Sequence, residues 1–174
     1  MTNAEIVLNL YRTLREAAGD ALLLGRNTIG HLGAGLFEAQ RVGDDVSSNT
    51  WERTRRMGIN AIAYRLAQNG TFFTRDPDGV AHTERTPWKL DSQFLDLVAR
   101  SGTAFFISAD PTKITSEQKQ AFHRVMQTAP SGSDAGNCEP LDWLHNTTPE
   151  KWRFGTEQVS YTWSEQMGAS PFLV

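Results

Sequence analysis

Apolar and polar residues follow two kinds of spacing along the first 128 positions, and the two kinds alternate. Apolar positions three or four residues apart predict helices, whereas short apolar runs bounded by turn residues predict buried strands. The segments with helical spacing are 1–19, 51–68, 88–100 and 115–128, with a further short helix inside 30–37. The segments expected to be strands are 21–24, 37–42, 71–74 and 103–107.

This order of helices and strands predicts a parallel α/β sheet, because parallel strands need helical crossovers between them. About four β/α units fit into the segment. Four units make half of an eight-fold (β/α)8 barrel of the TIM type, or a small open α/β sheet. The order of elements alone does not choose between these two.

Two sequences have the form of a capping box, in which residues three positions apart cap a helix N-terminus reciprocally. They are Asn49 with Glu52, and Thr115 with Gln118. The run Arg53, Arg55 and Arg56 is most simply the solvated face of the helix that the first box would open.

The character of the chain changes after Ala129, where a loop rich in serine and glycine begins. Residues 139–174 contain three of the five tryptophans but show no helical period, which predicts the start of a β module or a packed tail. We therefore expect two parts: a half-barrel over residues 1–129, and a loop with an irregular or β-rich tail over residues 130–174.

Composition narrows the classes of function. A net charge of −3 argues against nucleic-acid binding, which needs a basic surface. No apolar run is long enough to span a bilayer, and Met1 leads into a polar helix rather than a signal peptide. Cys138 is the only cysteine, and no cysteine–histidine cluster has zinc spacing. We expect no metal, cofactor, membrane or nucleic-acid partner, and the compartment stays open.

Polar residues follow each of the four predicted strands. The groups are Arg26-Asn27, Arg41 to Asp45, Arg75 to Asp78, and Ser108 to Asp110. Such residues form turns wherever they occur. However, the carboxyl ends of parallel strands meet at one edge of a sheet, where substrate chemistry gathers. Convergent carboxylates with arginine or asparagine suit recognition of sugar hydroxyls and acid–base work at a glycosidic bond.

The same residues resemble a known family over about residues 5–128. RVGDD, with Arg41 and Asp45, and DPD at Asp76 to Asp78 are similar to two strand-end motifs of retaining α-galactosidases and α-N-acetylgalactosaminidases. NTIGHLGAGLFEAQRVGDDV from Asn27 is similar to the segment that joins that family's fifth and sixth barrel strands. FFISADPTKITSEQKQAF from Phe105 is similar to its eighth strand and following helix.

The resemblance implies the C-terminal half of a barrel that cleaves terminal α-linked galactose or N-acetylgalactosamine. Asp45 would be the general acid/base, with Asp44 as the alternative, and that role would require a raised pKa. Arg41 would bind a sugar hydroxyl or orient the acid, unless it forms a structural ion pair with Asp44. The other substrate-binding candidates are Asn27, Asp76 and Asp78.

Two departures from the family limit what the resemblance implies. Relatives often carry a cysteine at the position of Arg26, which puts the sugar specificity in question. The family's nucleophile, an aspartate after the fourth strand, would lie before Met1. We therefore expect negligible turnover by this chain alone. We also expect the chain to pair with a second copy, to dock onto a separate N-terminal half of the barrel, or to be a fragment of a longer polypeptide, and we favour the fragment. The alternatives are a catalytically silent carbohydrate-binding half-barrel and an unrelated small α/β protein.

Aromatic and histidine side chains near these segments have two interpretations each. Trp51 and Trp88 could stack on a sugar face, but their positions at helix starts favour core packing. His31 and His82 have no partner at metal or triad spacing, so local hydrogen bonds are expected. Asp110 is expected to form a turn.

Overall fold

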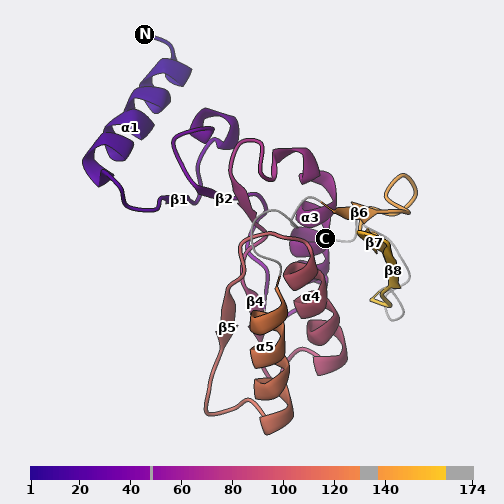
Figure 1. Ribbon diagram of the computed structural model, residues 1–174. Coiled ribbons are helices and arrows are strands. Elements are labelled where there is room, and N and C mark those ends of the chain that lie inside the picture. The colour runs from indigo at the N-terminus through magenta and orange to yellow at the C-terminus, as the bar shows by residue number, and fades with distance from the viewer. Residues whose placement is uncertain (48, 130–136, 164–174) are drawn as a thin grey trace.

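The computed structural model describes residues 1–47, 49–129 and 137–163 as a mixed α/β chain (Figure 1). Its helices are α1 (Asn3–Ala18), η1 (Gly30–Gly33), α2 (Trp51–Thr54), η2 (Arg55–Ile59), α3 (Asn60–Tyr64), η3 (Leu66–Gln68), α4 (Trp88–Arg100) and α5 (Ser116–Thr128). Its strands are β1 (Leu24–Gly25), β2 (Ala39–Arg41), β3 (Thr74–Asp76), β4 (Val80–His82), β5 (Ile107–Ala109), β6 (Cys138–Pro140), β7 (Lys151–Phe154) and β8 (Glu157–Ser160).

The first five strands form two parallel sheets, in the orders β1-β2-β3 and β4-β5. One backbone hydrogen bond links the first sheet to the segment before β5: the Ala104 nitrogen donates to the oxygen of Arg75 in β3. A second, from the Val80 nitrogen to the Phe106 oxygen, extends the pairing of β4 with β5. Parallel pairing agrees with the alternation in the sequence. The strands β1, β3 and β5 begin three or four residues later than expected, because the apolar runs lead into the paired residues rather than form the pairs themselves. The strand β4 was not predicted.

The helix expected over residues 51–68 is present but is divided. A π-helical turn, η2, separates α2 from α3, and a 3-10 turn ends the segment. The expected capping box at Asn49 is wrong, since Thr50 is the N-cap and Glu52 binds the guanidinium of Arg55 instead. The box of Thr115 with Gln118 at the start of α5 is confirmed.

The strands between Cys138 and Ser160 form a three-stranded antiparallel sheet, β6-β7-β8, whose apolar side joins the main core. Trp152 and Trp163 are buried in one cluster with Ile59 and Phe94. The tail also covers Arg55, which is buried and donates to the hydroxyl of Thr148. The solvated face expected for Arg55 is therefore wrong, because Glu52 and Thr148 satisfy its charge and hydrogen bonds.

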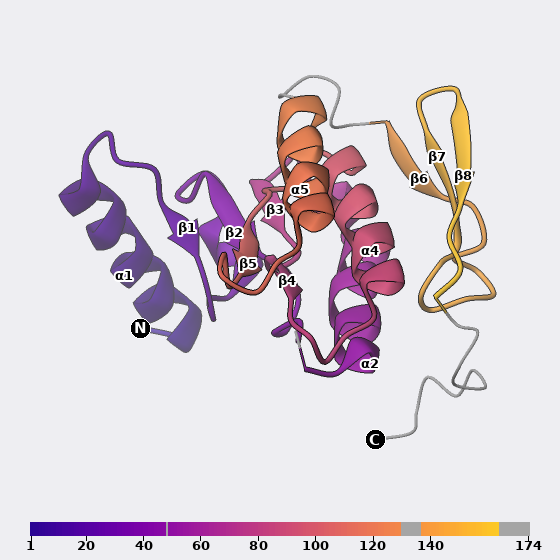
Figure 2. The same cartoon turned by 90° about the horizontal axis from the view of Figure 1, so that it is seen from below.

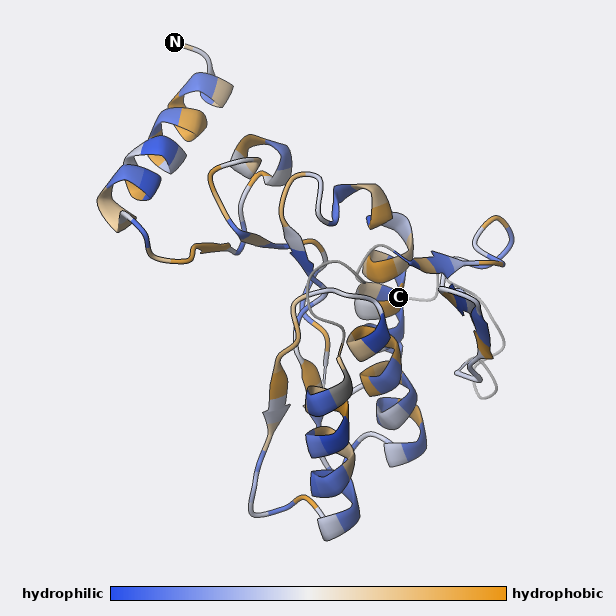
Figure 3. Cartoon of the chain, in the orientation of Figure 1, coloured by the Kyte–Doolittle hydropathy of each residue, from blue (hydrophilic) through white to orange (hydrophobic). Residues whose placement is uncertain are grey.

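The helix α1 lies at the end of the molecule opposite the antiparallel sheet (Figures 1 and 2), where its Tyr11 packs against Phe37. Tyr11 is its one buried residue, and the apolar bands visible along it in Figure 3 are largely exposed. They include Ile6, Leu10 and Leu14. Within the described ranges, no helix has both the length and the apolar character needed to cross a membrane.

Candidate functional site

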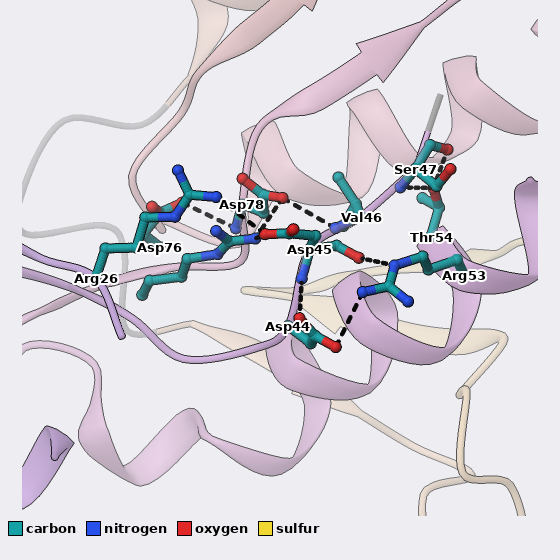
Figure 4. A network of polar contacts seen from close by, with 10 residues as sticks. Arg26, Asp44, Asp45, Val46, Ser47, Arg53, Thr54, Asp76 and Asp78 are labelled. Carbon is teal, nitrogen blue, oxygen red and sulfur yellow. Dashed lines mark hydrogen bonds and ion pairs between the residues drawn. The ribbon is translucent and has the colours of Figure 1, made fainter. Parts of the chain in front are cut away.

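Polar side chains gather where the three strands of the first parallel sheet end. Arg26 directly follows β1, Arg41 is the last residue of β2, and Asp76 is the last residue of β3. The register pairs Arg41 with Asp76, so the two strand ends lie side by side. Figure 4 labels Arg26 and Asp76 together with Asp45 and Asp78, which follow β2 and β3. The geometry agrees with the expected convergence for the three strand ends of this sheet, whereas the fourth predicted group, Ser108 to Asp110, lies at β5 in the other sheet.

Arg41 is at the centre of this group. Its side chain is only 4% exposed, and its Nη2 donates to Oδ1 of Asp45 and to Oδ2 of Asp78, both at 2.6 Å. A guanidinium has fixed, planar donors, so two carboxylates on one nitrogen set the orientation of all three side chains. The alternative ion pair with Asp44 is not formed, since Asp44 instead binds Arg53.

Asp45 lies at the surface of the site, with a side chain that is 54% exposed. Its Oδ1 accepts from Arg41 and also from Nη2 of Arg26, at 3.0 Å. These hydrogen bonds, Arg41's first and Arg26's second, hold the pKa of Asp45 below its ordinary value. The raised pKa expected of a general acid is therefore not found, because two cations, and no second buried carboxylate, are in contact with Asp45.

Asp76 and Asp78 take different positions at the end of β3. Asp78 has a positive φ of 72°, a backbone conformation that aspartate tolerates better than most residues. This turn lets its Oδ2 accept from the backbone nitrogen of Val46 as well as from Arg41. Asp76 is buried and accepts from the backbone nitrogen of Asp78. Burial raises the pKa of Asp76 above its ordinary value.

Two of the candidates lie outside the contacts of Arg41. Asp44 is exposed; its Oδ1 accepts from the Asp45 backbone nitrogen, and its Oδ2 pairs with Arg53. Asn27 is exposed and has a positive φ of 54°. Its side chain forms no hydrogen bond within the part of the chain that the structure describes. The structure therefore supports the turn-forming interpretation of Asn27 through its backbone conformation.

Arg26 was not among the predicted site residues, although it contacts Asp45 directly. The signal was present in the sequence. Arg26 directly follows a strand, and the predicted site residues likewise lie at or just after the ends of their strands.

A second polar group surrounds His82 at the end of β4. Nδ1 of His82 lies 2.5 Å from Oδ2 of Asp91, which also accepts from the hydroxyl of Thr86. Nε2 of His82 lies 2.8 Å from the amide nitrogen of Gln118. In a nucleophilic triad the hydroxyl contacts one imidazole nitrogen and the carboxylate contacts the other. Here the hydroxyl of Thr86 contacts the carboxylate of Asp91 instead, so the group is not such a triad. This group connects β4, α4 and α5.

The remaining polar and aromatic candidates have structural roles. Trp51 and Trp88 pack against the core cluster, as the core interpretation expected. Asp110 forms a turn, with its Oδ1 accepting from the backbone and side chain of Thr112. Across residues 1–47, 49–129 and 137–163, no three histidine, cysteine, aspartate or glutamate side chains are grouped so that they could hold a metal ion.

Comparison with known proteins gives a likeness in fold. No family model and no curated protein matches the sequence. A solved α-galactosidase from Thermus thermophilus, in complex with p-nitrophenyl α-D-galactopyranoside, is similar to 88% of this chain with a TM-score of 0.58 and 22% sequence identity. This chain covers 32% of the length of that enzyme. In its fold, therefore, the chain is similar to part of an α-galactosidase.

Proposed function

We propose that this chain is the sugar-binding, acid/base-supplying part of a retaining glycoside hydrolase that acts on terminal α-linked galactose or N-acetylgalactosamine. The observation that carries the proposal is the contact of Arg41 with Asp45 and Asp78 at the ends of β2 and β3. It agrees with the place where parallel α/β folds hold their substrates. The similarity in fold to part of an α-galactosidase supports the same assignment.

Asp45 is the proposed general acid/base, and Asp44 is the weaker alternative because its carboxylate is engaged by Arg53. Asp76 and Asp78 are proposed to face the substrate together with Arg41, and Asn27 is proposed to contact it from the β1 side. In this assignment Asp45 would protonate the leaving oxygen and later deprotonate the attacking water.

A second catalytic carboxylate has to come from elsewhere. Retaining hydrolysis uses two carboxyl groups about 5–5.5 Å apart on either side of the scissile bond. Asp78 is not proposed as the second one, because its Oδ2 already accepts from Arg41 and from the backbone nitrogen of Val46. A nucleophile brought close to Asp45 would also raise the pKa of Asp45, as a general acid requires.

Two apolar flanks are available for the missing half of a barrel. On one side, the exposed Ile6, Leu10 and Leu14 of α1 lie on the side of β1, the edge strand of its sheet. On the other side, a groove of about 820 Å³ lies between β5 and α5, with an apolar lining that includes Ile107, Phe122 and Met126. We propose residues 1–129 as the half-barrel and residues 130–174 as its tail, with an N-terminal half-barrel or a second copy covering both flanks.

The direct test is hydrolysis of p-nitrophenyl α-D-galactopyranoside, together with calorimetric titration of galactose. We expect negligible turnover by this chain alone and measurable galactose binding that Arg41→Ala abolishes. Robust Asp45-dependent hydrolysis by the pure chain would refute the need for a second half. Unchanged galactose binding by Arg41→Ala would refute the assigned site, with Arg15→Ala as a matched control at the remote Arg15–Glu38 pair.

The flanks are tested by size-exclusion chromatography with light scattering. We expect the wild-type chain to self-associate at micromolar concentrations, and we expect the double variant Leu10→Glu, Leu14→Glu to elute as a monomer. A stable wild-type monomer with no tendency to associate would count against both proposed partners.

A catalytically silent carbohydrate-binding half-barrel is the second candidate. The observation that favours it is the lowered pKa of Asp45, which suits a hydrogen-bond acceptor better than a proton donor. Galactose binding without any turnover, even after an N-terminal half is supplied, would select this candidate.

A further inference from the structure

Two arginines contact the same carboxylate oxygen, but they are held very differently. Arg41 and Arg26 both donate to Oδ1 of Asp45, at 2.6 and 3.0 Å (Figure 4). The Arg41 side chain is 4% exposed and has Asp78 as a second partner. The Arg26 side chain is 59% exposed, and Asp45 is its only hydrogen-bond partner within the described ranges. One cation is therefore fixed and the other is free to move.

Building on the proposed function, we propose that Arg26 is a positioning residue that holds Asp45 as an ionised hydrogen-bond acceptor and has to move aside before Asp45 takes up a proton. Arg26 would thus control when the site changes from sugar recognition to acid catalysis. The feature belongs to this chain, because it depends on an arginine directly after β1.

The geometry supplies the reason. A proton on Oδ1 would compete with two N–H donors that already point at that atom, whereas the ionised carboxylate accepts both. The other oxygen of Asp45, Oδ2, accepts no hydrogen bond from the described residues. Arg26 therefore leaves one oxygen open to a ligand hydroxyl while it stabilises the negative charge.

The charged groups around Asp45 come from every neighbouring element. Arg26 follows β1, Arg41 is in β2, Asp76 and Asp78 are at the end of β3, and the pair of Asp44 with Arg53 connects the β2 loop to α2. Asp78 neutralises part of the Arg41 charge, and Arg53 neutralises Asp44. Among the described residues, Arg26 forms its ion pair with Asp45, and its charge also acts on Asp76. Its removal should therefore affect Asp45 by the loss of a direct contact, and Asp76 only through the loss of a nearby charge.

Release of Arg26 from Asp45 costs little free energy. A solvent-exposed ion pair with one hydrogen bond is weak, and the arginine side chain is long and flexible. A sugar hydroxyl is also a hydrogen-bond donor, so it can replace Arg26 at Oδ1 without leaving the carboxylate unsatisfied. Arg41 is less easily replaced in this way, because its buried charge would lose one of its two carboxylate partners.

The test is a carboxyl-carbon NMR titration of Asp45 in the full chain without ligand. We expect the titration midpoint of Asp45 to rise in Arg26→Ala and to stay close to wild type in Arg26→Lys, which keeps a cation. The control is Arg15→Ala, which removes the equivalent ion pair with Glu38 and should raise the midpoint of Glu38 while leaving that of Asp45 unchanged.

An Asp45 midpoint that is the same in Arg26→Ala and wild type would overturn the proposal. If Arg26→Ala does not fold, Arg26→Gln provides the neutral substitution with similar volume, and the same outcome applies. Galactose calorimetry on the same samples separates the two proposals. A shifted midpoint without galactose binding would uphold the role of Arg26 but refute the sugar site, and galactose binding without a shift would do the reverse.

Discussion

Asp78 and Arg41 form an ion pair of 2.6 Å in which the arginine side chain is almost completely buried. Removing the carboxylate in Asp78→Ala leaves that charge with Asp45 alone and also removes the acceptor of the Val46 nitrogen. We expect a loss of about 2–4 kcal/mol in the free energy of unfolding, measured by urea denaturation, since one partner of a buried pair is lost.

Asp44→Ala is the matched control for this substitution. Asp44 belongs to the same loop, but its ion pair with Arg53 is exposed, so little stability should be lost. Equal losses in Asp44→Ala and Asp78→Ala would show that the position of the charge in the loop, rather than its burial, decides stability.

The hydrogen bond between Asp91 and His82 leads to a second prediction. Asp91 is buried and accepts from Thr86 as well, so Asp91→Ala strands two buried polar groups. We expect a loss of about 2–4 kcal/mol in the free energy of unfolding. Asp91→Asn keeps an acceptor oxygen at the same place, so its free energy of unfolding should fall clearly less than that of Asp91→Ala. A larger fall in Asp91→Asn than in Asp91→Ala would contradict the role given to that oxygen.

Asp76 gives a prediction for pH. Burial raises the pKa of Asp76 in the folded chain above its unfolded value, so the folded state binds the proton more tightly. The stability gained from this proton is fully present below the unfolded pKa and is lost as pH rises through the folded pKa. Asp76→Asn should therefore be more stable than wild type at pH 7, and the difference should shrink as pH is lowered toward 4. Urea denaturation at stepped pH measures both, and a difference that grows on acidification would contradict the sign.

Cys138 provides a chemical test of the antiparallel sheet. Burial raises the pKa of the Cys138 thiol to about 12, and the thiolate is the reactive form. We expect almost no reaction with a thiol reagent at pH 8 in the folded chain and complete reaction in urea. Rapid labelling of the folded chain would mean that β6 does not pack on the core as described.

The sequence predicted the alternation of helices and strands because that pattern is local. Apolar spacing found α1, α4 and α5, and residues three apart found the cap of α5. The boundaries of the strands were less accurate, since a short apolar run does not show which of its residues will pair. The same limit applies to β4, whose pairing with β5 depends on contacts between distant parts of the chain.

The sequence predicted which residues lie at the strand ends of the candidate site. It did not predict which of these residues form ion pairs and hydrogen bonds with one another. Strand ends brought Arg41, Asp45, Asp76 and Asp78 together. Arg41 pairs with Asp78 rather than with Asp44 because Asp78 lies in a turn with a positive φ. The spacing of residues in the sequence does not show this turn. The burial of Arg55 depends on the tail, nearly a hundred residues away.

The shared core of the helices and the antiparallel sheet has a consequence for how the molecule comes apart. Trp152 and Trp163 pack in one cluster with residues of α3 and α4, and the indole of Trp51 donates to the backbone oxygen of Trp163. Heat should therefore melt both regions in a single cooperative transition. A chain shortened to its first 129 residues would lose the antiparallel sheet that covers α3 and α4. The exposed apolar side chains of these helices would make it prone to aggregate.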